Sequence, residues 1–88
     1  MLVDAGTPTP SQCRAARAVL GWSLIEASRR AGRSIATISQ SERLEDAARS
    51  ADARTVVKAC YEQAGVSFLQ IREGQGLLWD VTEDRDRS

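Results

Sequence analysis

The sequence predicts a mainly α fold, in which four to five short helices are followed by a C-terminal β-hairpin or strand. Two observations carry this prediction. Up to Gly65, apolar residues recur at helical spacing in short segments that are separated by capping residues and glycines. After Gly65 the chain changes to β-branched and aromatic residues around a glycine-rich turn, a pattern typical of a hairpin. The length of 88 residues allows one small domain.

The two ends of the chain lie outside this pattern. Residues 1–9 show no usable periodicity, and we expect a flexible tail there. Residues 83–88 are almost all charged, so a polar tail is expected at the other end. Between them we expect a helical domain over residues 10–65 and a strand or hairpin over residues 66–82.

The first helix is expected over residues 10–20. Thr9 fits an N-cap, Pro10 suits the first helical position, and Gly21 ends the helix. The apolar face of this helix is formed by residues at helical spacing, namely Cys13, Ala16 and Leu20.

Two more helices follow, separated by a tight turn. Ser23, with a glutamate three residues later, has the form of a capping box and begins a helix over residues 24–31. Gly32 ends this helix, and Ser34 is the N-cap of a third helix over residues 35–43. Two short helices around such a turn form a helix-turn-helix, which presents its second helix to DNA.

A fourth helix and a hairpin complete the predicted fold. The helix is expected over residues 53–64, with Asp52 as its N-cap and Gly65 just beyond its end. Its inner face is expected to consist of Val56, Val57, Cys60 and Ala64. "VSFLQI" at 66–71 and "LLWDV" at 77–81 form the expected hairpin. An isolated hairpin is only marginally stable in water, so the helices or another subunit must cover it.

The charged residues are distributed unevenly, although the formal net charge is zero. From Ser11 to Arg43 the chain has six arginines and two glutamates, whereas from Leu44 to Ser88 it has six basic and nine acidic residues. A basic first half and an acidic second half suit a protein that binds a polyanion with one surface only. The alternative interpretation is a set of solvated charges that fall unevenly by chance.

Several function classes are excluded by composition. The chain has no histidine, which rules out Ser-His-Asp and Cys-His catalysis. Cys13 and Cys60 lack a CxxC spacing, so we expect no metal site and interpret both as small buried apolar residues. No glycine-rich phosphate loop and no long apolar run occur. We expect a cytoplasmic, nucleoid-associated binding protein that is not an enzyme and uses no cofactor.

Three segments resemble one known family. "RAARAVLGWS" at 14–23 is similar to that family's first helix and its Leu-Gly-aromatic-Ser junction. "IEASRRAGRSIATISQSE" at 25–42 is similar to its second helix, Ala-Gly turn, Ser cap and third helix with a final Glu. "ACYEQAGVSF" at 59–68 is similar to the last helix and strand of many bacterial members. The family is the XRE family, of the Cro and lambda-repressor type. The resemblance implies a lambda-repressor-like helix-turn-helix bundle and a sequence-specific, DNA-binding transcriptional regulator.

The resemblance also implies roles for individual residues. Arg17 and Glu42 match the positions of an internal ion pair that braces the first helix against the third. Ile35, Ala36 and Gln40 match positions that face base edges. Gln bonds adenine in a bidentate fashion and small apolar groups meet thymine methyls, so such a surface favours A·T pairs. Contacts to DNA phosphates are expected from the following residues on or beside the same helices: Ser23, Arg29, Arg33, Ser34, Thr37 and Arg43.

Some positions depart from the family pattern. Leu24 stands where a phosphate-binding Gln is frequent, and Arg33 and Ser41 stand where apolar residues are common. These departures weaken the phosphate contacts or the small core. A second function stays open because the third helix is apolar and Ser-rich and the net charge is zero: a helix-turn-helix fold that holds a protein partner, such as RNA polymerase, another regulator or a toxin. Ile38 and Trp22 are expected to pack inward.

The C-terminal strands carry more apolar surface than a four-helix domain of this size is expected to cover. We therefore expect a two-fold homodimer, in which two recognition helices lie about one DNA turn apart. The alternative is a monomer whose hairpin folds back on its own helices. The expected dimer contacts are Phe68, Leu69, Ile71, Leu77 and Trp79.

Overall fold

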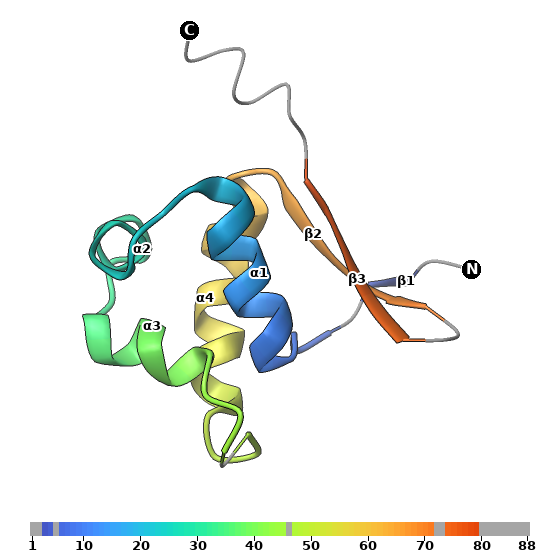
Figure 1. Ribbon diagram of the computed structural model, residues 1–88, viewed down its shortest axis with the longest axis horizontal. Coiled ribbons are helices and arrows are strands. Elements are labelled where there is room, and N and C mark those ends of the chain that lie inside the picture. The colour runs from blue at the N-terminus through green and yellow to red at the C-terminus, as the bar shows by residue number, and fades with distance from the viewer. Residues whose placement is uncertain (1–2, 5, 46, 72–73, 80–88) are drawn as a thin grey trace, which may run out of the picture.

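The computed structural model describes residues 3–4, 6–45, 47–71 and 74–79. Within these residues the chain is mainly α, with four helices and a small antiparallel sheet (Figure 1). The helices are α1 (Pro10–Leu20), α2 (Leu24–Ala31), α3 (Ile35–Ser41) and α4 (Ala51–Gln63). The strands are β1 (Val3–Asp4), β2 (Val66–Ile71) and β3 (Gly74–Trp79).

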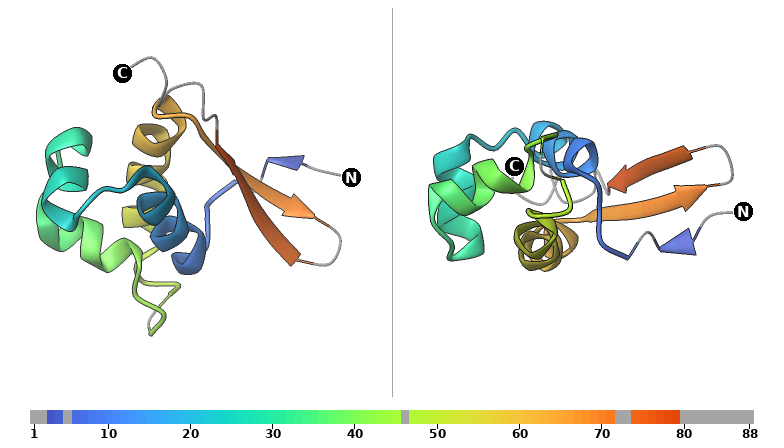
Figure 2. Two further views of the ribbon diagram at one scale, coloured as in Figure 1. Left: turned by 45° about the horizontal axis from the view of Figure 1, so that its top comes forward. Right: turned by 90° about the horizontal axis from the view of Figure 1, so that it is seen from below.

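α2 and α3 lie at one end of the molecule and the sheet lies at the other. α1 and α4 pack side by side in the centre, with α2 and α3 on one side of them and the strands on the other (Figures 1 and 2). α3 packs against both α2 and α4, so one side of this short helix is covered and the other is free. The hairpin projects away from α2 and α3.

The first three helices begin at the side-chain caps that the sequence predicts. Thr9 Oγ1 accepts a hydrogen bond from the Gln12 amide at 3.1 Å, and Gln12 Oε1 accepts one from the Thr9 amide at 2.9 Å. Ser23 and Ser34 each cap their helix by accepting from the amide three residues further on. These bonds satisfy donors that have no partner within a helix, so each helix start is determined locally.

Two glycines end α1 and α2. Gly21 and Gly32 have φ values of 71° and 66°, in the left-handed region where a side chain is strained. Each amide closes its helix on a carbonyl of the preceding turn. The chain therefore turns sharply after α1 and after α2, as the sequence predicts.

α3 and α4 differ from the predicted helices at their ends. α3 stops at Ser41, two residues before the expected end at Arg43. α4 begins at Ala51, so Asp52 lies in its first turn and is not the N-cap. The residue at the N-cap is Ser50, whose side chain makes no capping bond. α4 ends at Gln63, one residue before the expected end, and Gly65 directly follows the C-cap residue, Ala64, as predicted.

The predicted inner face of α4 is partly wrong. The buried residues of this helix are Arg54, Val57 and Tyr61, whereas Val56 is 37% exposed and Cys60 is half-buried. An arginine is rarely buried unless its donors are satisfied. Arg54 meets this condition, because Nε donates to the Pro8 carbonyl at 2.7 Å and Nη1 donates to a serine hydroxyl at 2.6 Å.

Aromatic side chains connect the helices to the sheet. Tyr61 lies between Trp22 and Phe68, with ring centroids 5.9 Å and 6.2 Å away. Trp22 packs against the core from a half-buried position, as expected for this residue. The Tyr61 hydroxyl has no hydrogen-bond partner among the described residues. The buried core consists of Cys13, Ala16, Ala27, Ile38, Val57, Tyr61, Val66 and Phe68.

The N-terminal segment is more ordered than the expected flexible tail. Val3 and Asp4 form β1, which pairs antiparallel with Gln70 and Leu69 of β2. Further along the segment, Pro8 is buried and its carbonyl accepts the bond from α4. The physical reason is that a strand edge has unpaired amides and carbonyls, which a neighbouring extended segment satisfies.

The hairpin is present and has β2 at its centre. The sheet order is β1-β2-β3, and β2 pairs with β3 from Val66 opposite Trp79 to Ile71 opposite Gly74. β3 thus begins within the predicted turn, three residues before the expected Leu77. α1 contacts the sheet directly, since Gln12 Nε2 donates to a β2 carbonyl at 3.1 Å. The end of the predicted second strand and the tail at 83–88 lie outside the described residues.

Cys13 makes the stability of this core sensitive to alkaline pH. The thiol is fully buried, and burial raises its pKa from 9.0 to about 12. This contribution to stability is present below about pH 9 and is lost as the pH rises toward 12, because the unfolded thiol ionises first. We predict a fall in the free energy of unfolding between about pH 9 and pH 12 that is smaller in Cys13→Ala. Parallel denaturant melts of both proteins check this, and equal falls would contradict it.

Candidate nucleic-acid interface

An ion pair holds α3 against α1. Arg17 Nε donates to Glu42 Oε2 at 2.7 Å, and Arg17 Nη2 donates to Glu42 Oε1 at 3.0 Å. The remaining nitrogen, Nη1, donates to the carbonyl of Trp22 at 3.0 Å. The predicted pairing of Arg17 with Glu42 is therefore confirmed. It is bidentate, which restricts orientation as well as distance.

The surroundings strengthen this brace. The Arg17 and Glu42 side chains are only 21% and 10% exposed, so water screens the pair less than at an open surface. The hydrogen bonds to the Glu42 carboxylate raise the pKa of the Arg17 guanidinium. Tyr61 lies nearby, and burial raises the pKa of its phenol, which leaves the ring neutral at physiological pH.

α3 has one buried and one exposed face. Ile38 and Ser41 are fully buried, and the Ser41 hydroxyl donates to the Ile38 carbonyl at 2.6 Å. A serine at this core position is therefore satisfied within its own helix turn. The side chains on the outer face are exposed, including Ile35 at 45%. That outer face contains all three predicted base-facing residues: Ile35, Ala36 and Gln40.

The turn before α3 is held by short-range bonds. The Ser28 hydroxyl of α2 donates to the carbonyl of Arg33, which fixes the chain just before the cap. The Ser34 hydroxyl caps the helix, and it lies 3.0 Å from the Thr37 hydroxyl. The Arg33 side chain is exposed and has no hydrogen-bond or ion-pair partner among the described residues. Three predicted phosphate contacts thus lie together at this end of α3.

The arginines of α2 are engaged within the protein. Arg29 Nη2 donates to both Glu26 carboxylate oxygens at 2.9 Å, and Arg30 Nε donates to one of them at 2.5 Å. These bonds lower the pKa of Glu26. Arg30 also lies 4.9 Å from the Trp22 ring centroid, within cation–π range. Arg29, a predicted phosphate contact, is exposed, but it is bonded to the Glu26 carboxylate. It can contact a DNA phosphate only by releasing that carboxylate.

The same bonds alter the predicted capping box of α2. Ser23 accepts from the Glu26 amide at 3.0 Å, which is half of the motif. The Glu26 carboxylate points to the two arginines, and the structure records the reciprocal bond only for the α1 cap. Charge attraction along one helix face therefore prevails over the second capping bond.

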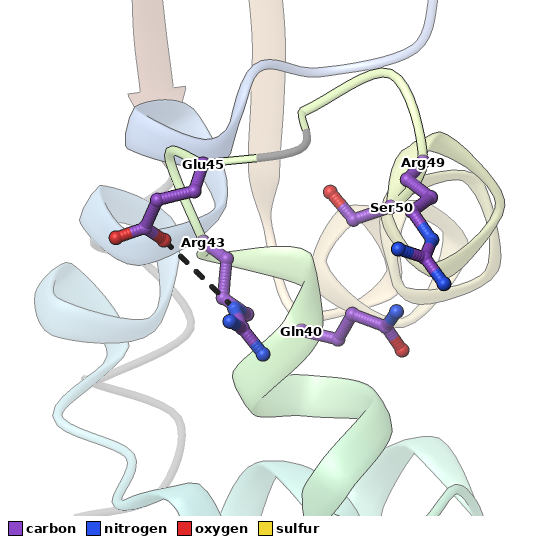
Figure 3. Close-up of a pocket in the computed structure, with 5 residues that line it drawn as sticks. All are labelled: Gln40, Arg43, Glu45, Arg49 and Ser50. Carbon is purple, nitrogen blue, oxygen red and sulfur yellow. Dashed lines mark ion pairs between the residues drawn. The ribbon is translucent and has the colours of Figure 1, made fainter.

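A hollow of about 210 Å³ lies beyond the end of α3. It is lined by Gln40, Arg43, Glu45, Arg49 and Ser50, as Figure 3 shows. Arg43 and Arg49 lie on opposite sides of it, and the Gln40 side chain extends between them from α3. Arg43 Nε is 3.9 Å from Glu45 Oε1, which is too long for a hydrogen bond. Arg49 was missed at the sequence level, because the segment around it has no recognisable pattern.

Gln40 also borders a second hollow of about 270 Å³ between α3 and the start of α4. This one has mixed chemistry, with a cation, a carboxylate and an apolar side chain in its lining. Gln40 thus stands on the ridge between a basic hollow and a mixed one. The residues of the second hollow are Arg33, Thr37, Gln40, Asp52, Ala53 and Val56.

The predicted dimer contacts differ in where the structure places them. Phe68 is fully buried in the core of its own chain, so its assignment as a dimer contact is wrong. It faces the helices because β2 packs directly on α4. Leu69 is half-buried. The remaining residues belong to the paired strands, but their side chains lie outside the description: Ile71, Leu77 and Trp79.

Comparison of the chain with models of protein families, with curated proteins and with solved structures finds no match. Within the described residues, no group of three or more Cys, Asp or Glu side chains is placed to hold a metal ion. In the same part of the chain, every helix is too short or too polar to cross a membrane. The functional assignment therefore depends on the geometry of the surface around α3.

We predict that Glu42→Ala lowers the free energy of unfolding by roughly 2 kcal/mol or more, between the values for exposed and buried pairs. The loss arises because the Arg17 guanidinium remains half-enclosed without its carboxylate. Chemical denaturation measures it. Arg29→Ala is the matched control, since its ion pair is at the surface. Equal, small losses in both variants would show that the brace contributes no more than a surface pair.

Proposed function

We propose that this protein is a sequence-specific DNA-binding transcriptional regulator of the lambda-repressor-like helix-turn-helix type, with α3 as the helix that enters the major groove. The observation that carries the proposal is the outer face of α3. It is free of other elements, while the opposite face is buried and braced by the Arg17–Glu42 pair. A helix that reads bases needs both properties, because its side chains must be exposed and its axis fixed.

The chemistry of this face favours contacts with A·T pairs. The Gln40 amide has the donor and acceptor that match the adenine edge, and Ala36 is small and apolar enough to meet a thymine methyl. Ile35 adds an exposed apolar group at the start of the helix. The face provides few hydrogen bonds, so base selectivity is expected to be modest.

Affinity is expected to come mainly from contacts with phosphates. Arg33 and Arg43 flank α3 at its two ends, and neither is held by a short ion pair in the described part of the chain. The Ser34 cap and the Thr37 hydroxyl lie at the amino end of the same helix, where polar groups suit a nearby phosphate.

A second function remains a candidate on one observation. Ile25 and Leu44 are 67% and 69% exposed, in addition to Ile35 on α3. Ile25 lies on α2, Ile35 on α3 and Leu44 just after α3, so each adds exposed apolar area to the helix-turn-helix that a protein partner can cover. The alternative is therefore a helix-turn-helix module that holds a protein partner such as RNA polymerase, another regulator or a toxin.

We further propose that the regulator acts as a two-fold homodimer. β2 is paired on both sides, whereas β3 has only one paired edge among the described residues. An unpaired edge of six residues accepts a second strand, and two copies of β3 satisfy each other in an antiparallel C2 contact. This contact lies on the far side of α1 and α4 from α3, which leaves α3 free for DNA (Figure 2).

Gln40→Ala tests base reading. We expect a loss of roughly 1–3 kcal/mol at the preferred site and little change on other duplexes, because only the base contact is removed. The preferred site comes from a selection of random duplexes, and titrations across a salt series measure both affinities. Gln63→Ala, an exposed glutamine at the end of α4, is the matched control. Binding that is weak and independent of salt would favour the protein-partner alternative.

The dimer is tested by sedimentation at micromolar concentration. We expect a species of twice the 9.6 kDa chain mass, which Trp79→Asp in β3 dissociates by placing a charge at the contact. Ser67→Asp, at an exposed position of β2, is the control and is expected to remain dimeric. A single 9.6 kDa species for the unmodified protein would reject the dimer in favour of the monomer with a folded-back hairpin.

A further inference from the structure

The hollow beyond α3 has a donor-rich lining. Of its five lining residues, two carry guanidinium groups and one an amide, against a single carboxylate on Glu45. We call it the Arg43–Arg49 hollow. Its volume of about 210 Å³ exceeds by far the ~10–15 Å³ that admits one water, so a polyatomic anion and bridging waters fit inside.

Neither arginine of this hollow is firmly held. The Arg43–Glu45 pair is 3.9 Å long between side chains that are 60% and 78% exposed, a combination that contributes little binding energy. Arg49 is exposed and has no side-chain partner within the described residues. The arginines with structural roles differ clearly, since Arg17 and Arg54 each make a 2.7 Å hydrogen bond.

Ser50, the buried member of the lining, is engaged by its own neighbours. Ser50 is 3% exposed, and its hydroxyl donates to the Ala47 carbonyl while accepting from Arg54. Apart from Glu45 and the Gln40 amide oxygen, the side chains of the hollow that can still bind a ligand are donors, and most of them belong to the guanidinium groups of the two arginines on its opposite sides (Figure 3). A ligand must supply several acceptor oxygens and negative charge, and a phosphate group has both.

We propose that the Arg43–Arg49 hollow binds a single phosphate group between its two guanidinium groups, and that Glu45 competes with this phosphate for Arg43. The source of the phosphate rests on the proposed function: with α3 in the major groove, a DNA backbone phosphate beside the base read by Gln40 lies at the hollow. Glu45 then acts as an internal counter-anion that limits the affinity for every sequence.

Salt-dependent DNA binding of four variants tests this proposal. Arg43→Gln and Arg49→Gln are each expected to weaken all duplexes and to lower the salt slope by about one. The double variant is expected to lower it by about one as well, because losing either guanidinium opens the site. Glu45→Gln is expected to tighten binding of all duplexes by up to about fivefold. Arg14→Gln, an exposed arginine of α1 outside the hollow, is the charge-matched control.

Two results of the DNA titrations overturn the proposal without touching the proposed function. If Arg49→Gln behaves like Arg14→Gln while Gln40→Ala still changes base preference, DNA is read but the hollow holds no phosphate. If the double variant lowers the slope by about two, the arginines bind separate phosphates and the shared site is rejected.

A titration with inorganic phosphate distinguishes the two sources of the phosphate group, the DNA backbone and a free phosphorylated molecule. Phosphate is titrated at constant ionic strength while NMR follows the Nε–H resonances of the arginine side chains. We expect saturable shifts of Arg43 and Arg49 that are absent from Arg49→Gln. If the unmodified protein binds no duplex, the proposed function fails and this titration decides alone. A saturable shift then retains the site for a free phosphorylated molecule, and its absence overturns the site.

Discussion

The bidentate pair of Arg17 and Glu42 is the interaction on which the arrangement of the short helices depends. One guanidinium joins α1, the carbonyl of Trp22 after α1, and the carboxylate at the end of α3. α2 and α3 have eight and seven residues, lengths at which isolated helices are marginal in water. These two helices are therefore stabilised by tertiary contacts. The Arg17–Glu42 pair is the tertiary contact that fixes the end of α3 to α1.

The parts of this fold that could be predicted are those with local causes. The caps at Ser23 and Ser34 and the glycine stops depend on neighbours within one turn, so sequence spacing reveals them. Arg54 could not be predicted as a core residue, because its acceptor on Pro8 lies 46 positions away. Arg49 was missed as part of the candidate site because the segment around it has no recognisable pattern. Its position in the hollow depends on how the loop before α4 folds back toward Gln40.

The charge pattern of the sequence overstates the positive charge that the surface offers. Six arginines stand against two glutamates up to Arg43, but both glutamates are used to neutralise arginines. Arg17 is paired with Glu42, and Arg29 and Arg30 are both paired with Glu26. Of the three arginines left for a partner, Arg33 and Arg43 flank α3 at its two ends, and Arg14 lies on α1. A surface built this way binds a polyanion at a few defined points and presents no broad basic field.

The pairing of β1 with β2 has a consequence for how the chain reaches its folded state. Residue 4 meets residue 69, so the sheet is completed only after almost all of the described chain is available. The contacts of α1, α2 and α3 are shorter in range and can form first, since local contacts close smaller loops. During synthesis from the N-terminus, the helices can form before β2, the strand that pairs with β1, has been made. β1 can therefore join the sheet only after β2 has been made, when the helices that lie between them in the sequence can already be ordered.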